Sequence, residues 1–307
     1  MKLGFCGSGF FAAECLKHIT QYIKPQWVIT NTPQKAGRSL KLCVTPVQKT
    51  AEKLDIPFKT TNVISEDNKL INWIDENSPD VILVIDFGQM IKEPLLSLPK
   101  FGCLNIHPSK LPSYRGSSPL QRAIVDGLKT TAVTVFKLDE GMDTGPILVQ
   151  KEMEISIKDD YYSLLKKSSL LGSHALIEHI IKITPEHWIF TEQSENDISF
   201  APKIKKSEGI LSWDEKASFL YNKIRAFKHF PGTFCFIDGK RLAIKEAEIV
   251  KKSGPSSSII GFESGMPIVA CLEDALKLIT VQQEGKREQK ASEWVRGSRM
   301  QIGDKFN

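Results

Sequence analysis

Short apolar segments that alternate with amphipathic helices constrain this fold more than any other feature of the sequence. Residues 80–87 (DVILVIDF) are almost continuously apolar, as a strand covered on both faces of a sheet is. Residues 102–106 share this character, whereas residues 131–137 alternate more and are typical of a strand nearer the sheet edge. The pattern predicts an α/β fold: a Rossmann-like, mostly parallel sheet with helices on both faces, over roughly the first 185 residues.

The elements expected in this region follow from periodicity and from capping residues. Strands are predicted at 2–6, 27–30, 57–59, 80–87, 102–106 and 131–137, and helices at 10–23, 45–54, 66–76, 118–126 and 161–183. Thr45 and Pro46 mark one helix start, because Thr caps helix N-termini and Pro suits the first helical position. The polar, basic residues 31–44 are expected to form a loop.

The character of the chain changes near residue 184. Residues 184–206 are polar and aperiodic, which indicates a linker. After a helix at 217–227, short strand-like segments follow at 233–237, 242–249, 259–262, 267–271 and 276–282. They predict a small C-terminal β-barrel, for which the OB-fold is one candidate. We therefore expect a first domain at 1–187, a linker at 188–204 and a second domain at 205–307.

The positive charge of the chain is concentrated in its last third. Residues 1–200 carry 22 Lys and Arg against 23 Asp and Glu, a net charge of −1. Residues 201–307 carry 19 against 13, a net charge of +6. A basic module beside a neutral one suggests a polyanionic partner, because neutralised phosphates drive such binding. A solvated basic surface without a partner is the alternative.

Cysteine usage and hydropathy exclude several classes of protein. The six cysteines are scattered without a CxxC pair, which argues against a disulfide scaffold or a structural zinc site and fits a reducing, cytoplasmic environment. The longest apolar runs fall short of the ~20 residues that a membrane helix needs. We therefore expect no membrane association.

A glycine turn near the N-terminus raises the possibility of a dinucleotide site. Residues 7–12 (GSGFFA) match G-x-G-x-x-A between a strand and a helix. The acidic residue that would hold the ribose is missing, because the second predicted strand ends Ile29-Thr30-Asn31. Two phenylalanines also stand where a phosphate would approach. The turn is better explained as tight packing of the strand against the helix.

Polar side chains with catalytic potential gather in residues 101–150. Asn105 and His107 alternate at the end of an apolar strand, so both side chains point to one face. Asp143 lies in the loop after the next predicted strand. Because ligands bind at carboxyl strand ends in open sheets, we expect these groups to meet at two neighbouring strand ends. Each alone is explained as a turn residue, but together they favour an acid–base and oxyanion-binding site.

The order of these motifs resembles the folate-dependent formyltransferases. The similar core segments are Asn105-x-His107, Ser109-Lys110-Leu111-Pro112 with Tyr114-Arg115-Gly116, and Asp139-x-Gly141-Met142-Asp143-Thr144-Gly145. Residues 33–38, 200–204, 208–213, 224–227 and 297–299 resemble the branch of the family that acts on methionyl-tRNA. The resemblance covers essentially the whole chain in motif order. The first turn, Pro108 and Lys110 depart from the family pattern.

The resemblance implies a donor, an acceptor and a division of roles. The donor would be 10-formyltetrahydrofolate and the acceptor the amino group of initiator methionyl-tRNA, with no metal. Asn105 would donate a hydrogen bond to the oxyanion, His107 would add a charged donor, and Asp143 would orient His107 and accept a proton. Folate would be held by Ile85, Phe87, Gly88, Ser109, Lys110, Leu111, Pro112, Leu138, Asp139 and Gly141. The tRNA would be bound by Lys35, Arg38 and Lys41 and by the basic C-terminal domain, on a monomer.

Other functions share parts of this pattern. A sugar-nucleotide formyltransferase with the same folate donor is the main alternative, and only the basic loop and the C-terminal charge speak against it. A purine-pathway formyltransferase would lack the appended basic domain, and a folate hydrolase would pass the formyl group to water. A non-enzymatic RNA-binding module would not need the Asn105, His107 and Asp143 set.

Overall fold

The computed structural model describes residues 1–36, 41–77 and 79–306, which form two compact units. Unit 1 consists of Met1–Pro119, Thr130–Glu154 and Leu165–Pro202. Unit 2 consists of Leu120–Lys129, Ile155–Leu164 and Lys203–Asn307. The chain therefore passes between the units five times. The domain boundaries expected at residues 187 and 205 stay a prediction.

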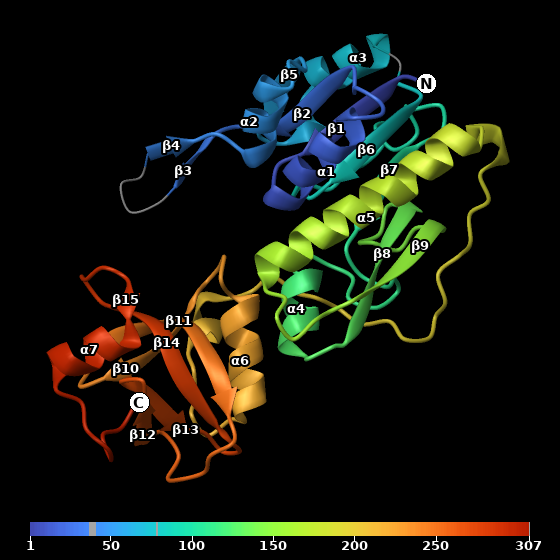
Figure 1. Cartoon of the computed structure of the whole chain (residues 1–307). Coiled ribbons are helices and arrows are strands. Elements are labelled where there is room, and N and C mark those ends of the chain that lie inside the picture. Colours follow the sequence, from blue (N-terminus) through green and yellow to red (C-terminus); the bar gives the residue numbers. More distant parts are fainter. Residues whose placement is uncertain (37–40, 78, 307) are drawn as a thin grey trace. The chain divides into compact units, whose positions relative to one another are not determined.

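A seven-stranded sheet forms the centre of unit 1, in the order β5-β2-β1-β6-β7-β8-β9 (Figure 1). The strands are β1 (Leu3–Gly7), β2 (Trp27–Asn31), β5 (Phe58–Thr61), β6 (Val81–Ile85), β7 (Cys103–His107), β8 (Thr130–Lys137) and β9 (Ile147–Glu154). The first five strands of this order, from β5 through β2, β1 and β6 to β7, pair in parallel with their neighbours. Strand β8 is antiparallel to both β7 and β9. The predicted α/β class with a mostly parallel sheet is confirmed.

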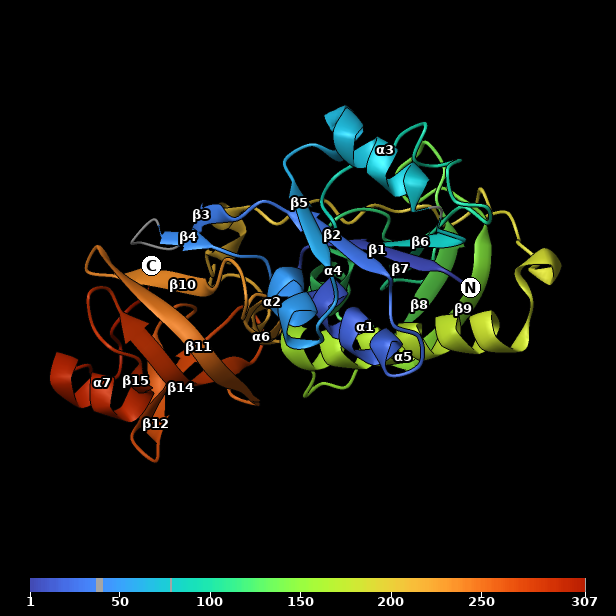
Figure 2. The same cartoon turned by 90° about the horizontal axis from the view of Figure 1, so that it is seen from above.

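Helices cover both faces of this sheet. Figure 2 shows α3 on one face and α1, α2 and α5 on the other. The bounds are α1 (Phe10–Thr20), α2 (Pro46–Lys53), α3 (Asn68–Glu76), α4 (Pro119–Val125) and α5 (Tyr161–Lys182), with 3-10 turns at Ile64–Glu66, Pro185–His187 and Lys206–Gly209. Ile71 and Ile74 of α3 pack with Val84 and Cys103 in one apolar cluster. On the other face α5 approaches so closely that a Cβ at Gly172 would lie 2.4 Å from Ile106.

Most elements of unit 1 begin and end near their predicted residues, and the exceptions are polar. Thr45 caps α2, with its hydroxyl accepting a hydrogen bond from the Gln48 N–H at 3.0 Å. Strand β9 was missed because this edge strand carries charged, exposed side chains. Residues 31–44, expected to be a loop, contain a two-stranded hairpin of β3 (Gln34–Ala36) and β4 (Lys41–Cys43). Such short, exposed strands leave no apolar pattern in the sequence.

Unit 2 is built on an antiparallel sheet in the order β10-β11-β14-β13-β12, with β15 paired to β14. The strands are β10 (Thr233–Ile237), β11 (Lys240–Val250), β12 (Ile259–Glu263), β13 (Met266–Ala270), β14 (Ala275–Gln283) and β15 (Gln289–Lys290), and the helices are α6 (Ala217–Ala226) and α7 (Ala291–Ser298). Leu220 of α6 and Trp294 of α7 pack into one core with Leu276 and Leu278 of β14. The predicted C-terminal domain of short antiparallel strands is confirmed.

Two elements of unit 2 were not predicted. Helix α7 buries Ala291, Trp294 and Val295, a spacing of three and four residues that is too short to stand out as a period. Strand β15 has two residues. In the part of the chain that the structure describes, no helix has the length and apolar character needed to cross a membrane.

Candidate active site

Asn105 and His107 share the face of the sheet that α3 covers. Ile106 between them packs against α5 on the opposite face, so alternation along β7 turns its two neighbours away from α5. Asn105 is half-buried and His107 is 6% exposed. Strand β7 therefore presents an amide and an imidazole on one face, near its carboxyl end.

Asp143 reaches His107 by a route that differs from our expectation. Strand β8 is antiparallel to β7, with Lys137 opposite Leu104, so β8 ends beside the start of β7. The following loop returns over the α3 face, where Leu138 packs against the apolar cluster of that face. The carboxylate thus arrives across the face of the sheet. The expectation of two neighbouring strand ends was wrong, because it assumed that the two strands run in parallel.

The imidazole of His107 lies between two oxygen acceptors. Its Nδ1 is 3.6 Å from Asp143 Oδ2, and its Nε2 is 2.9 Å from the carbonyl oxygen of Tyr114. A ring that donates from Nε2 to the Tyr114 carbonyl leaves Nδ1 facing the carboxylate of Asp143 at a distance beyond hydrogen-bond length. The pair can therefore present an imidazole nitrogen and a carboxylate at one point.

Backbone groups fix the position of Asp143. Its Oδ2 accepts a hydrogen bond from the Gly116 N–H at 2.7 Å. Its φ of +56° lies in the left-handed region, which Asp tolerates better than most residues. A Cβ at Gly145 would lie 1.8 Å from the carbonyl oxygen of Lys137, so only glycine allows the loop to close this tightly. The carboxylate is held by a loop with little freedom to move.

Gln193 is a supporting residue that the sequence did not indicate. Its Nε2 donates to the carbonyl oxygens of Asp143 and Gly145, at 2.8 Å each. Its Oε1 accepts hydrogen bonds from the Arg115 guanidinium at 2.7 and 3.2 Å. Gln193 lies in the aperiodic segment 184–206, where neither period nor motif could single it out. The segment predicted to be a linker therefore also braces the Asp143 loop.

The segment Ser109–Pro112 is an ordered turn beside β8. The Ser109 hydroxyl donates to the Ser113 carbonyl at 2.7 Å, and the Ser109 carbonyl accepts from the Thr134 hydroxyl at 2.7 Å. Leu111 is buried, and the Leu111–Pro112 peptide bond is cis. Lys110 is exposed and forms an ion pair with Glu152 on β9. If Lys110 also contacts folate, its ammonium group must bind Glu152 and the folate at the same time.

The other predicted folate residues lie at the end of β6 and in the loop of residues 138–145. Phe87 and Leu138 pack against the same apolar cluster, so the structure brings the end of β6 and the start of the 138–145 loop together. Gly88 follows with a φ of +76°, while Ile85 is fully buried within β6. Asp139 Oδ1 accepts hydrogen bonds from the Gly141 N–H at 3.0 Å and the Thr144 hydroxyl at 2.6 Å, which closes the loop.

The carboxylate of Asp86 explains why glycine stands at residue 9, in the turn before α1. Its carboxylate accepts hydrogen bonds from the N–H groups of Phe11 and Ala12, and so caps α1 from the end of β6. A Cβ at Gly9 would lie 1.8 Å from Asp86 Oδ2, so a carboxylate at residue 86 requires glycine at residue 9. A negative charge at the start of α1 opposes a dinucleotide phosphate there.

Asp86 is expected to make the stability of the protein depend on pH. Desolvation by the surrounding protein raises the pKa of Asp86 to about 6, against the opposite effect of its two backbone hydrogen bonds. The protonated form is therefore favoured in the folded state, and its contribution to stability is lost as pH rises through about 6. The side chain of Asp86 is solvent-exposed, so water offsets most of this desolvation and we expect a small effect. The urea midpoint should fall between pH 5 and 7 more in the wild type than in Asp86→Asn. Parallel pH profiles would contradict this.

Two of the three predicted tRNA-binding cations lie on the β3–β4 hairpin. Lys35 of β3 and Lys41 of β4 are exposed. Arg38 lies outside the described residues. In strand register, Lys35 pairs with Leu42 and Ala36 with Lys41. Leu42 is also 68% exposed, so the hairpin offers both charge and an uncovered apolar side chain.

The arrangement suits transfer of an acyl-type group. Among the described residues, no three His, Cys, Asp or Glu side chains gather as metal ligands do. The site offers an amide donor, an imidazole and a carboxylate acceptor on one sheet face. Such a set can stabilise a developing oxyanion and remove a proton from a nucleophile.

Comparison with known families agrees with this chemistry. The family model described as formyl transferase matches residues 6–180, and the model described as the formyl transferase C-terminal domain matches residues 203–299. The chain belongs to the formyl transferase family. The three residues of the candidate site all lie within the first match. Their roles in catalysis stay a prediction.

Full-length relatives in this family share a common description. The chain is 35% identical over 312 residues to methionyl-tRNA formyltransferase of Caldicellulosiruptor saccharolyticus, with 99% of each chain covered. It is also 35% identical over 291 residues to methionyl-tRNA formyltransferase of Kosmotoga olearia, covering 94% of this chain and 93% of that protein.

Solved structures of formyl transferases share the fold at lower identity. The sugar 3N-formyl transferase WlaRD, solved with dTDP and 5-N-formyl-THF, gives a TM-score of 0.66 at 20% identity over 94% of this chain and 99% of that one. Methionyl-tRNA formyltransferase from Clostridium thermocellum gives 0.55 at 17% identity over 91% and 99%. At such identities the likeness concerns the fold alone.

Proposed function

We propose that this chain transfers the formyl group of 10-formyltetrahydrofolate to the amino group of the methionyl residue on initiator tRNA. The observation that carries the chemistry is the His107–Asp143 pair, 3.6 Å apart, on the sheet face that bears Asn105. Full-length relatives at 35% identity that are described as methionyl-tRNA formyltransferases support the choice of acceptor. An enzyme that acts on initiator tRNA is expected in the cytoplasm. We also expect this protein to be a monomer.

The residues at the end of β6 fit a folate arm. Phe87 and Leu138 belong to one apolar cluster, and the partly buried Leu138 leaves surface that a flat ring could contact. The buried Leu111 supports the turn on the other side of β7. The remaining contacts would come from Gly88, Ser109, Lys110, Pro112, Asp139 and Gly141, with Ile85 contributing only backbone. When bound, the folate would supply the formyl group.

Asn105 would stabilise the charge that develops during the transfer. When the amine attacks, its nitrogen bonds to the formyl carbon and negative charge grows on the formyl oxygen. As that charge returns to the carbon, the bond to the folate nitrogen breaks, and tetrahydrofolate leaves with the proton that the amine gave up. The Asn105 side-chain amide donates to that oxygen, and the Nδ1 proton of His107 adds a charged donor. A donor held in place before the reaction stabilises the transition state without reorganisation.

Asp143 would serve as the proton acceptor of the site. The attacking amine must be neutral, and the proton that it loses needs an acceptor nearby. Asp143 Oδ2 is held by the Gly116 N–H at 2.7 Å, which keeps the carboxylate next to His107. Gln193 acts through Asp143, because it binds the carbonyl oxygen of that residue.

A competition among acceptors tests the proposed function. The purified chain would be given 10-formyltetrahydrofolate with charged initiator tRNA, with a UDP-amino sugar, or with water alone. We expect formylated methionyl-tRNA and little product in the other two arms. Formylation of the sugar in place of tRNA would overturn the proposal in favour of a sugar-nucleotide formyltransferase.

The β3–β4 hairpin is expected to contribute to tRNA affinity through Lys35 and Lys41. Replacing both with alanine should raise KM for tRNA and leave kcat nearly unchanged, because neither residue belongs to the proposed catalytic set. Each lost phosphate contact should reduce the slope of log affinity against log salt by about 0.7–0.9. The measurement is KM for tRNA from 50 to about 200 mM salt. Lys69→Ala on α3 removes an equally exposed charge and serves as the control. An unchanged slope would contradict this role.

A further inference from the structure

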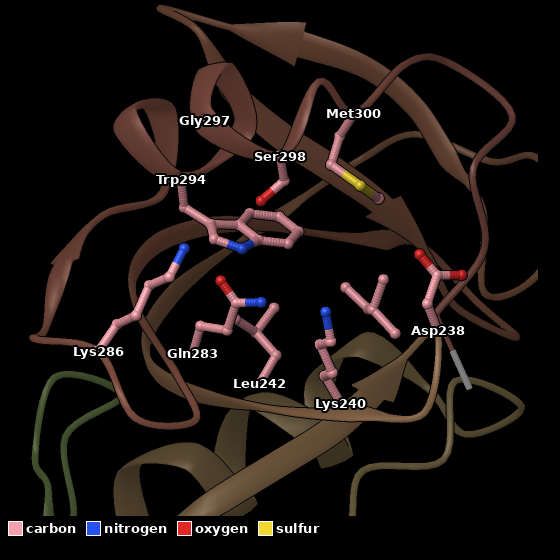
Figure 3. Close-up of a pocket in the computed structure, with 10 residues that line it drawn as sticks. Asp238, Lys240, Leu242, Gln283, Lys286, Trp294, Gly297, Ser298 and Met300 are labelled. Atoms are coloured by element: carbon pink, nitrogen blue, oxygen red, sulfur yellow. The ribbon is translucent and has the colours of Figure 1, made fainter.

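A cavity of about 260 Å³ opens in unit 2, between the β10–β11 turn, the turn after β14 and the end of α7 (Figure 3). Lys240 and Lys286 line it together with Asp238, so a carboxylate stands beside its cations. Leu242 and Trp294 belong to the core and are 1% and 3% exposed, which leaves little wall for a ligand to contact. The cavity therefore does not make a binding site, whereas the turn beside His107 has features that the proposed chemistry leaves unexplained.

Tyr114 adopts a backbone conformation that is unusual for its side chain. Its φ of +60° lies in the left-handed region, where a bulky residue is strained. Strain of this kind persists only where the surrounding structure holds the residue in place, and it is concentrated at functional sites. The carbonyl oxygen of Tyr114 lies 2.9 Å from His107 Nε2. A strained residue therefore contacts the imidazole of the candidate site directly.

The Tyr114 carbonyl sets which nitrogen of the neutral His107 ring carries the proton. A carbonyl oxygen can only accept a hydrogen bond, so this contact requires a proton on Nε2. Nδ1 is then the nitrogen that faces Asp143, 3.6 Å away. A partner at one ring nitrogen fixes both the tautomer and the orientation of a histidine. A proton that the ring gains during the reaction therefore enters at Nδ1, on the side of Asp143.

Residues 197–201 run alongside the turn at 112–118, and both segments belong to unit 1. Backbone hydrogen bonds of 2.7–3.4 Å join the two segments. They connect Ser199 to Pro112 and Arg115, and Ala201 to Arg115 and Ser118. Backbone groups make these bonds whatever side chain stands at residue 199. A substitution at that residue can therefore leave this ladder in place.

One hydrogen bond between the two segments does depend on a side chain. The Ser199 hydroxyl accepts a hydrogen bond from the Tyr114 N–H at 3.0 Å. Ser199 is half-buried, so the bond is partly shielded from water. Tyr114 thus has its N–H bound to Ser199 while its carbonyl oxygen contacts His107. The hydroxyl of Ser199 supports the strained residue on the side opposite the imidazole.

We propose that Ser199 is a positioning residue for the formyl transfer. Its hydroxyl keeps Tyr114 in the left-handed conformation, and the Tyr114 carbonyl keeps His107 protonated on Nε2 with Nδ1 toward Asp143. Ser199 acts through these residues and not on the substrate. The kinetic part of this inference rests on the proposed function, whereas the tautomer of His107 does not.

Heteronuclear NMR of the histidine ring nitrogens tests the proposal without any substrate. The signals of His107 in the full chain would be assigned with the variant His107→Gln. In the wild type we expect the neutral ring to carry its proton on Nε2. Ser199→Ala should introduce the form protonated on Nδ1, because the Tyr114 carbonyl is no longer held in place. Ser199→Thr keeps the hydroxyl and should give the wild-type spectrum.

Steady-state kinetics test the consequence for the reaction. Ser199→Ala should lower kcat for methionyl-tRNA formylation by about two- to tenfold at unchanged KM, the factor that one hydrogen bond commonly contributes. Ser199→Thr should restore kcat. Ser194→Ala is the matched control, because the Ser194 hydroxyl accepts a hydrogen bond from the Asn196 N–H, outside the 112–118 turn. It should leave both kcat and the His107 spectrum unchanged.

Several results would overturn the inference. One is a neutral wild-type His107 ring protonated on Nδ1, and another is a wild-type spectrum in Ser199→Ala. A loss of kcat that Ser194→Ala shares, or that Ser199→Thr fails to restore, would show a merely structural role. A higher KM for tRNA at unchanged kcat would assign Ser199 to acceptor binding instead. If the wild-type chain forms no formylated tRNA, the proposed function fails, while the spectra still decide whether Ser199 positions His107.

Discussion

Replacing Asp143 with asparagine is expected to lower kcat for formyl transfer by about 10²–10⁴, the range that one acid–base group supplies. Asparagine can still accept the Gly116 N–H and tolerates the φ of +56°, so the loop should keep its shape. The negative charge beside His107 would be lost, and with it the acceptor for the proton of the amine. The measurement is the rate of formylation of methionyl-tRNA at saturating substrates.

A neighbouring carboxylate controls for the loss of charge. Glu140→Gln removes an exposed negative charge from the same loop and should change kcat by less than twofold. A loss below tenfold in Asp143→Asn, or an equal loss in both variants, would show that Asp143 does not accept the proton.

The variant Asn105→Ala is expected to lower kcat/KM by about 10²–10³, as the loss of one oxyanion donor does. The effect should fall on kcat, because the hydrogen bond strengthens only as charge develops. Asn105→Asp keeps the size of the side chain but replaces a donor with a negative charge, so its loss should be at least as large. Single-turnover rates with both variants provide the measurement. A rise in KM at unchanged kcat would assign Asn105 to ground-state binding instead.

The order of strands and helices in this chain was largely predictable because burial leaves a pattern. The run at 80–87 and the shorter run at 102–106 became β6 and β7, the central strands covered on both faces. Elements with little buried surface left no such pattern. Strand β9 buries only Leu148, β4 is exposed, and α7 buries only three residues.

The candidate site was predictable as a set of residues but not as a geometry. Apolar runs show that a strand exists, but not in which direction it pairs. The antiparallel direction of β8 therefore changed the path by which Asp143 reaches His107. Gln193 could not be found at all, because its hydrogen bonds to two backbone carbonyls depend on folded contacts some 50 residues away along the chain.

The repeated passage of the chain between its two units has a consequence for protein engineering. Arg225 of α6 donates to the carbonyl oxygens of Ser156 and Asp159, and Arg122 pairs with Glu208, all within unit 2. A fragment cut after Pro202 would keep residues 120–129 and 155–164 but lose these partners. Chimeras joined at a single point near residue 203 would inherit mismatched surfaces, whereas exchanging all three segments of unit 2 would transplant it intact.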